Sequence, residues 1–303
     1  MFLTLCRVLT PSSRLWVLAT AFVPYAALGY SFVLLVVALA FRWSRRRWLL
    51  VIAGLAGVGL VFHLALLAPL YAGPHRHGRA DLTVMTANLR LGEADPRSVV
   101  RLVRDQHVDL LVLEEVTPAV AGALVADGIL AALPHAAGSP APGAGGTVVV
   151  SRYPLTSQAV LATGHGGYRM QVQAPRPFWL VAVHPSQPLT DVSAWSRDWS
   201  AIDGALAALH GPRLLVGDLN STLDHGPVRT ALDGGLHDAA TEADSGWQPT
   251  WPSGVKPYRL PFGVGLFAID HVLASAPFAA VATETFDVAG TDHRALVARL
   301  RIS

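Results

Sequence analysis

The chain has 303 residues, enough for one large domain or two ordinary ones with a buried core. Before Asp81 the only charged residues are eight arginines, so that region has a net charge of +8. The remaining 15 basic and 21 acidic residues give residues 81–303 a net charge of −6. The C-terminal region therefore lacks the overall positive charge that favours nucleic-acid binding. The single cysteine, Cys6, excludes a disulfide and a cysteine nucleophile from that region.

Two long uncharged segments come first. Leu15 to Phe41 contains 27 residues, and Trp48 to Gly73 contains 26 with only His63 interrupting the apolar pattern. Each exceeds the roughly 20 residues that cross a bilayer as a helix, and both are longer than the apolar core of a signal peptide. The pattern predicts a membrane anchor over residues 1–73 with transmembrane helices at about 15–41 and 48–73. Pro24 is a position where the first helix can kink.

The connection between these segments predicts the orientation of the anchor. Residues 42–48 include four arginines and two tryptophans, which is typical of a cytoplasmic loop at a membrane surface. Both ends of the hairpin then face outward, although Arg7, Arg14, Arg76 and Arg79 reduce the charge asymmetry. We therefore expect an integral protein of the cell membrane whose C-terminal domain is extracytoplasmic.

After a predicted linker at 74–80, the pattern changes to alternating short apolar runs over residues 81–303. Asp81 to Leu89 alternates like a strand, and Asp95-Pro96 is typical of a helix start. Further strands are predicted at 108–113, 147–150, 179–183, 213–216, 268–273 and 296–300. Helical spacing returns between Asp191 and Leu209, while 134–146 and much of 244–262 are predicted loops. The sequence indicates a mixed α/β domain whose sheets are covered by helices.

Polar residues recur at the ends of these predicted strands. A strand end can present a side chain at a sheet edge, yet each residue alone also has an ordinary structural explanation, such as a turn, a cap or a surface position. The residues are Asn88, Glu114, Glu115, His184, Asp218, Asn220, Asp270, His271, Asp292 and His293.

The order of these motifs along the chain resembles that of the endonuclease/exonuclease/phosphatase superfamily. The matching elements are Asn88-Leu89, Leu113-Glu114-Glu115-Val116, Gly146-Thr147 through Ser151-Arg152-Tyr153-Pro154, Val183-His184, Gly217-Asp218-Leu219-Asn220, Thr250-Trp251-Pro252, Ile269-Asp270-His271 and Thr291-Asp292-His293-Arg294. The resemblance covers residues 81–303. It implies an α/β (α+β) fold: a two-sheet β-sandwich flanked by helices, with four layers as in deoxyribonucleases.

The resemblance also implies a divalent metal and its ligands. Glu115 corresponds to the main ligand of a catalytic Mg²⁺, for which Mn²⁺ is a possible substitute. Asn88 corresponds to the asparagine that supports the metal or a phosphate oxygen, and Asp292 is expected beside the metal. Hard oxygen ligands suit Mg²⁺, which keeps waters and bridges to phosphate.

The remaining matched residues are implied to act on the phosphate. Asp218 would orient or deprotonate the attacking water, and Asn220 would donate to a phosphate oxygen. His293 would contact the scissile phosphate, with Asp270 orienting its ring, while His184 would bind a phosphate oxygen from the other side. In-line attack on a phosphoester needs an activated water, a cation and donors for the phosphate oxygens, and this set supplies all three.

Two positions depart from the family pattern, and two others have alternative roles. Glu114 replaces the usual glutamine, so it either adds charge beside Glu115 or points away, and Thr291 replaces the usual serine. Arg169 is a candidate for a mid-chain phosphate contact, with an ordinary strand or loop charge as the alternative. Trp251 is expected to pack near the site more readily than to stack on substrate.

The sequence thus predicts a membrane-anchored, metal-dependent hydrolase of phosphodiesters or phosphomonoesters. The anchor favours a phospholipid or lipid-linked phosphate, because tethering raises the effective concentration of the site at the bilayer. An envelope-bound nuclease acting on DNA or RNA is the alternative, which the charge of −6 does not favour. A catalytically silent scaffold with the same fold is a further alternative.

Overall fold

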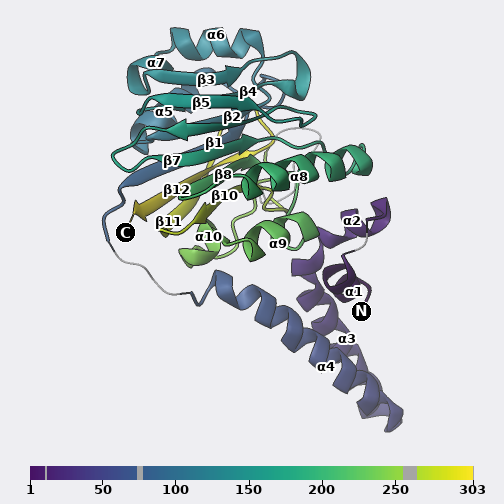
Figure 1. The fold of residues 1–303 in the computed structure, drawn as a ribbon. Coiled ribbons are helices and arrows are strands. Elements are labelled where there is room, and N and C mark those ends of the chain that lie inside the picture. The colour runs from purple at the N-terminus through teal and green to yellow at the C-terminus, as the bar shows by residue number, and fades with distance from the viewer. Residues whose placement is uncertain (11, 74–77, 255–264, 303) are drawn as a thin grey trace.

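The structure is a computed structural model that describes residues 1–10, 12–73, 78–254 and 265–302. Helices at the N-terminus form one part, and a two-sheet α/β domain forms the other (Figure 1). Residues 74–77 of the predicted linker and 255–262 of the predicted loop lie outside the described residues.

The first apolar segment is not one continuous helix. It contains α2 (Arg14–Thr20) and the 3-10 turn η1 (Val23–Tyr25), which lead into α3 (Ala26–Ser44), and a further short helix, α1 (Phe2–Leu9), precedes it. The break coincides with Pro24, which has no backbone N–H to continue a helix. The second segment forms α4 (Trp48–Leu67) and η2 (Ala68–Leu70). The described stretches long and apolar enough to cross a membrane are Val23–Ser44 and Trp48–Leu70, beside the expected spans of about 15–41 and 48–73.

The α/β domain contains two six-stranded sheets. The first has the order β11-β12-β1-β2-β4-β3. Its strands are β1 (Leu82–Asn88), β2 (Leu110–Glu114), β3 (His135–Ser139), β4 (Thr147–Ser151), β11 (Phe278–Asp287) and β12 (Arg294–Ile302). The second has the order β5-β6-β7-β8-β10-β9. Its strands are β5 (Leu155–Val160), β6 (Gly167–Val172), β7 (Phe178–Val183), β8 (Arg213–Asp218), β9 (Leu236–Asp238) and β10 (Asp270–Ser275).

The sheets pack face to face, with helices on both outer faces (Figure 1). The first sheet is covered by α5 (Pro96–Asp105), α6 (Pro118–Ala126) and α7 (Ile129–Ala132). The second is covered by α8 (Val192–Ala207) and α9 (Gly226–Asp233), and the short α10 (Ala239–Glu242) follows β9. This arrangement confirms the predicted helix-flanked two-sheet sandwich.

Local sequence explains several of these elements. Asp95 caps α5 by accepting from the backbone N–H groups of Arg97 and Ser98, as the helix start predicted. The prediction of a loop throughout 134–146 was wrong, because β3 lies within it. That strand pairs with β4 at the sheet edge and is only partly buried, so its alanine and glycine residues carry no apolar strand pattern.

Strand register brings the ends of several strands to one edge of the sandwich. β1 and β2 are parallel, with Asn88 opposite Glu114. β8 and β10 are antiparallel, with Asp218 opposite Asp270. β7 is parallel to β8 and is followed directly by His184. Both sheets therefore present polar side chains into the same gap.

Candidate active site

Asn88 links the two sheets at this edge. Its Nδ2 donates to Glu115 Oε1 at 3.1 Å and to Asp218 Oδ2 at 3.0 Å, while its Oδ1 accepts from the Arg90 N–H at 2.8 Å. All three side chains of this bridge are buried. One amide therefore holds two carboxylates close together and lowers the cost of burying their charge.

Glu115 is fixed by an uncommon backbone conformation. Its φ is 56°, in the left-handed region that non-glycine residues rarely adopt, and its Oε2 accepts from the Leu91 N–H at 2.6 Å. Such conformations cluster at functional sites, where the surrounding structure maintains them.

On the opposite sheet, Gly217 has a φ of 145°, and an added Cβ would collide with the Val183 carbonyl oxygen. The strand carrying Asp218 can approach β7 only because residue 217 is glycine.

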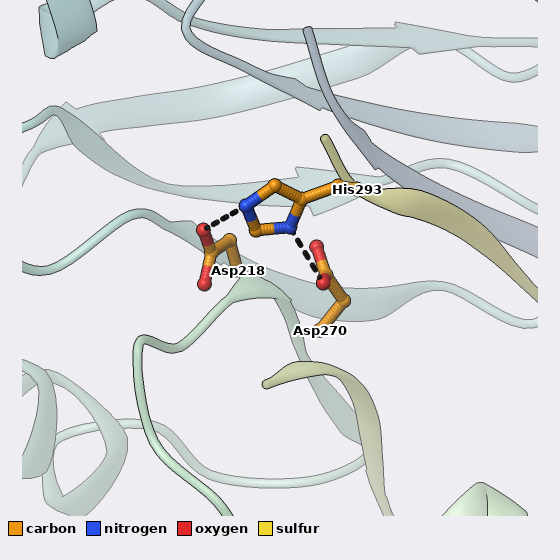
Figure 2. A group of neighbouring side chains, drawn as sticks. All are labelled: Asp218, Asp270 and His293. Carbon is orange, nitrogen blue, oxygen red and sulfur yellow. Dashed lines mark hydrogen bonds and ion pairs between the residues drawn. The ribbon is translucent and has the colours of Figure 1, made fainter. Parts of the chain in front are cut away.

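His293 lies between two carboxylates (Figure 2). Its Nδ1 donates to Asp270 Oδ2 at 2.9 Å, and its Nε2 lies 3.7 Å from Asp218 Oδ2. Burial alone lowers the pKa of the ring, but the charges of Asp270 and Asp218 outweigh it and raise the pKa of His293 to about 10. The imidazolium is therefore the stable form at neutral pH, ready to donate to an anionic oxygen.

His184 and His165 complete the opposite wall. His184 Nε2 lies 3.5 Å from Asp218 Oδ2 and 4.0 Å from Glu115 Oε1, and neither of its buried ring nitrogens has a hydrogen-bond partner within the described structure. The His165 ring lies 4.8 Å from the His184 ring, and burial followed by the charge of His184 lowers the pKa of His165. Sequence reasoning missed His165. Its position in the glycine-rich run 164–167 was the available signal, because such runs allow close backbone approach.

Asn220 and Asp292 lie farther out than the central carboxylates. Asn220 donates its backbone N–H to Asp218 Oδ1 at 2.9 Å and its Nδ2 to the Pro185 carbonyl at 2.9 Å. Asp292 Oδ2 accepts from Trp251 Nε1 at 3.2 Å, and its Oδ1 lies 3.9 Å from Arg90 Nε. Asn220 thus orients the Asp218 carboxylate, whereas Asp292 forms part of the rim.

Three positions with alternative interpretations now have defined surroundings. Glu114 points into the core, where Thr86 Oγ1 donates to its Oε1 at 2.9 Å. Burial, followed by the charges of Asp270 and Asp218, raises the pKa of Glu114 well above its ordinary value, which favours the neutral form of its side chain. The Trp251 ring stacks on the Phe267 ring, with ring centroids 6.0 Å apart. The Arg169 guanidinium lies 5.9 Å from the centroid of the Trp179 ring.

The donor set fits a divalent cation. Asp218, Asp270 and His293 each offer a ligand atom, and these atoms lie within 4.8 Å of one another. Asp270 Oδ1 is buried without a hydrogen-bond partner in the described part of the chain. However, His293 Nδ1 already donates to Asp270, and Asp218 is an ion-pair partner of the same ring, so we regard the Glu115 side as the better cation position. The oxygen-rich set suits a hard ion.

Comparison with known proteins identifies the family. The profile of the Endonuclease/Exonuclease/phosphatase family matches residues 85–293. The chain belongs to this family. Members of the endonuclease/exonuclease/phosphatase family are phosphoesterases or nucleases, and the chain is an enzyme that hydrolyses ester bonds. A comparison with the curated proteins gave no match.

Solved structures share the endonuclease/exonuclease/phosphatase fold with the chain. An endonuclease/exonuclease/phosphatase from Beutenbergia cavernae is 22% identical in sequence and has a TM-score of 0.58. The match covers 74% of this chain and 72% of the Beutenbergia chain. An AP endonuclease from Archaeoglobus fulgidus is 16% identical, with coverages of 72% and 98% and a TM-score of 0.58. A 3′ phosphatase from Neisseria bound to a product DNA hairpin is 19% identical, with coverages of 72% and 98% and a TM-score of 0.54.

Proposed function

We propose that the chain is a membrane-anchored, divalent-metal-dependent hydrolase of phosphodiesters or phosphomonoesters. It acts outside the cytoplasm, and its substrate is a phospholipid or a lipid-linked phosphate. The observation that carries the catalytic part is the position of Asp218, whose Oδ2 lies within 3.0 to 3.7 Å of Asn88, His184 and His293. These neighbours hold the Asp218 carboxylate in one position, where it can accept a proton from a water molecule beside a bound phosphate.

The groups divide the chemistry among them. Asp218 orients a water and takes its proton as the water oxygen bonds to phosphorus and the ester P–O bond breaks. His293, held by Asp270, donates to the phosphate oxygens, and His184 and Asn220, which both lie beside Asp218, have the same role. A Mg²⁺ ion, or Mn²⁺ in its place, would be held by Glu115 with Asn88 and Asp292, and would neutralise phosphate charge.

A chain of contacts supports action at a membrane surface. Phe22 lies next to the first apolar helix and packs edge-on against Phe267, with ring centroids 5.0 Å apart. Phe267 stacks on Trp251, whose indole donates to Asp292 in the site. Tyr25 also donates to the Leu266 carbonyl at 2.5 Å. The predicted anchor is thereby attached to the rim of the catalytic gap, which favours a substrate presented by the bilayer.

A nuclease is the second candidate. Two structural neighbours are an AP endonuclease and a 3′ phosphatase bound to a product DNA hairpin, and the same groups can act on a nucleic-acid phosphate. The charge of −6 after residue 80 speaks against it. A silent scaffold is disfavoured because Glu115, Asp218, Asp270 and His293 are all retained.

Purified full-length protein tests this proposal. We expect it to hydrolyse bis-para-nitrophenyl phosphate with Mg²⁺ or Mn²⁺, to lose activity in chelator, and to prefer sphingomyelin or lysophospholipid vesicles over DNA. Asp218→Asn is the inactive control. Preference for DNA would favour the nuclease, and folded protein without metal-dependent turnover of any phosphoester would contradict the enzyme. Protease accessibility of residues 81–303 in intact cells checks the orientation.

A further inference from the structure

His271 is a buried strand-end residue to which the proposed chemistry assigns no role. It follows Asp270 on β10, and successive side chains of a strand point to opposite faces of the sheet. Asp270 faces His293 in the catalytic gap, as Figure 2 shows, so His271 points away from that gap. Any effect of His271 on the reaction must therefore pass through other residues.

Both nitrogens of the His271 ring are hydrogen-bonded. Nε2 lies 3.0 Å from the Ser221 carbonyl oxygen and 3.1 Å from the Ala268 carbonyl oxygen. Because a carbonyl oxygen only accepts, Nε2 carries a proton and donates to both. Nδ1 donates to Asp238 Oδ1 at 3.2 Å. Burial lowers the pKa of His271, but the hydrogen bond and charge of Asp238 outweigh it and raise the pKa, so the ring is a charged and therefore strong donor.

The two carbonyls belong to segments that lead to catalytic carboxylates. Ser221 lies three residues after Asp218, and Ala268 lies two residues before Asp270. The ladder between β8 and β10 includes the pair of Asp218 and Asp270. The Nε2–H group of His271 thus joins the two chain segments just beyond that pair. We call its bonds to the two carbonyls the backbone clamp.

The segment after β8 contains a backbone conformation that its surroundings must hold. Asn220 has a φ of 46°, in the left-handed region, and its N–H donates to Asp218 Oδ1 at 2.9 Å. Such conformations persist only where neighbouring contacts maintain them. The next residue, Ser221, accepts at its Oγ from the Trp195 and Trp199 indoles of α8, at 3.0 Å and 3.2 Å. The backbone clamp holds its carbonyl from the side of β10.

We propose that His271 is a positioning residue of the reaction, whose backbone clamp fixes the segment carrying Asp218 relative to the strand carrying Asp270. The proposal rests on the proposed function, because that function assigns the roles of these two carboxylates. The clamp itself carries the effect. The ion pair with Asp238 stabilises the fold, and an uncharged partner can orient the ring equally well.

Variants of the full-length protein separate the backbone clamp from the ion pair. His271→Asn places an amide nitrogen near the position of Nδ1 and loses the clamp, whereas His271→Gln places one near the position of Nε2 and keeps it. Asp238→Asn removes the charge of the pair, yet its amide can donate to Nδ1 of a neutral His271 whose Nε2 keeps its proton. The exposed His210→Asn is the matched control.

Turnover of bis-para-nitrophenyl phosphate with Mg²⁺ is measured well below the Tm of each variant and expressed per folded molecule. His271→Asn should lower kcat by roughly tenfold or more with KM within about twofold, because a displaced Asp218 activates water less well. His271→Gln should restore kcat to within roughly threefold of the wild type. Asp238→Asn should stay in the same range although its Tm falls. A merely structural role would lower Tm and leave kcat unchanged in all of them.

Hydrogen exchange read by mass spectrometry tests the clamp without turnover. The amides of residues 219–222 should exchange roughly tenfold faster in His271→Asn than in the wild type or His271→Gln. If His271→Asn does not fold, Asp238→Asn combined with His271→Leu replaces it, since this pair removes the donor without leaving an unpaired buried charge.

Three outcomes would count against these proposals. Unchanged exchange or unchanged kcat in the variant without the donor would overturn the backbone clamp. Equal falls of kcat in Asp238→Asn and His271→Asn would assign the effect to the ion pair and overturn it as well. An inactive wild-type protein would refute the proposed function, whereas the exchange rates decide the clamp independently of it.

Discussion

Protonation of His225 provides a sharp test of how the N-terminal helices are attached to the catalytic domain. Its Nδ1 accepts from the Thr222 N–H at 2.9 Å, so the ring proton is on Nε2, which donates to the Val17 carbonyl of α2 at 3.0 Å. Burial lowers the pKa of His225 from 6.5 to about 4. The neutral ring is thus favoured in the folded protein, and its stabilising contribution is complete above pH 6.5 and lost as the pH falls toward 4.

The size of the effect follows from this shift. A fall in pKa from 6.5 to about 4 corresponds to about 3 kcal/mol of folding free energy lost between pH 7 and pH 4. For a chain of this length, that predicts a fall in Tm of roughly 6 to 12 °C from this residue alone. His225→Gln removes the titration while keeping a donor for Val17, so its Tm should fall less than that of the wild type over the same pH range.

Tryptophan fluorescence is a suitable assay, because the Trp195 ring centroid lies 5.8 Å from that of His225. Thermal unfolding of the full chain in detergent would be followed at pH 7 and pH 4. The exposed His210→Gln is the matched control and should behave like the wild type. Titrations of other groups are common to all three proteins and cancel in the comparison. Equal falls in Tm for the wild type and His225→Gln would refute the reasoning.

Three further predictions concern the catalytic gap. Asp218→Asn and His293→Ala should each lower kcat on a para-nitrophenyl phosphodiester by about a hundredfold or more. The circular dichroism spectrum of each variant should be unchanged. A near-normal kcat in either variant would contradict the assigned roles. Glu114→Gln should keep kcat within roughly threefold of the wild type, because the Glu114 side chain is buried against Thr86 and burial favours its neutral form. A loss like that of Asp218→Asn, measured in the same assay, would contradict this. His165→Ala should lower kcat/KM by roughly tenfold if its ring contacts the substrate phosphate, and an unchanged value would leave it a packing residue of His184.

The sequence by itself determined the fold class and most of the candidate site residues. The buried strand β2 is a continuous apolar run, β1 alternates, and both end in polar residues, so each strand and its functional end are encoded within a few neighbouring positions. Membership of the family followed from the order of such short motifs. Edge strands such as β3 and β5 gave no comparable signal, because they are only partly buried and their side chains need not be apolar.

Only the tertiary structure decided how these residues act on one another. Whether Glu114 or Glu115 faces the gap depends on strand alternation and on a left-handed backbone conformation at Glu115, which composition does not reveal. The bridge from Asn88 to Asp218 joins residues 130 positions apart, and the hydrogen bond from His225 to Val17 joins residues 208 positions apart. Local sequence specifies which functional groups stand at each strand end. The packing of the two sheets and the helical hairpin sets the distances between these groups and their burial, and these determine their charge, their pKa and the ligand they can bind.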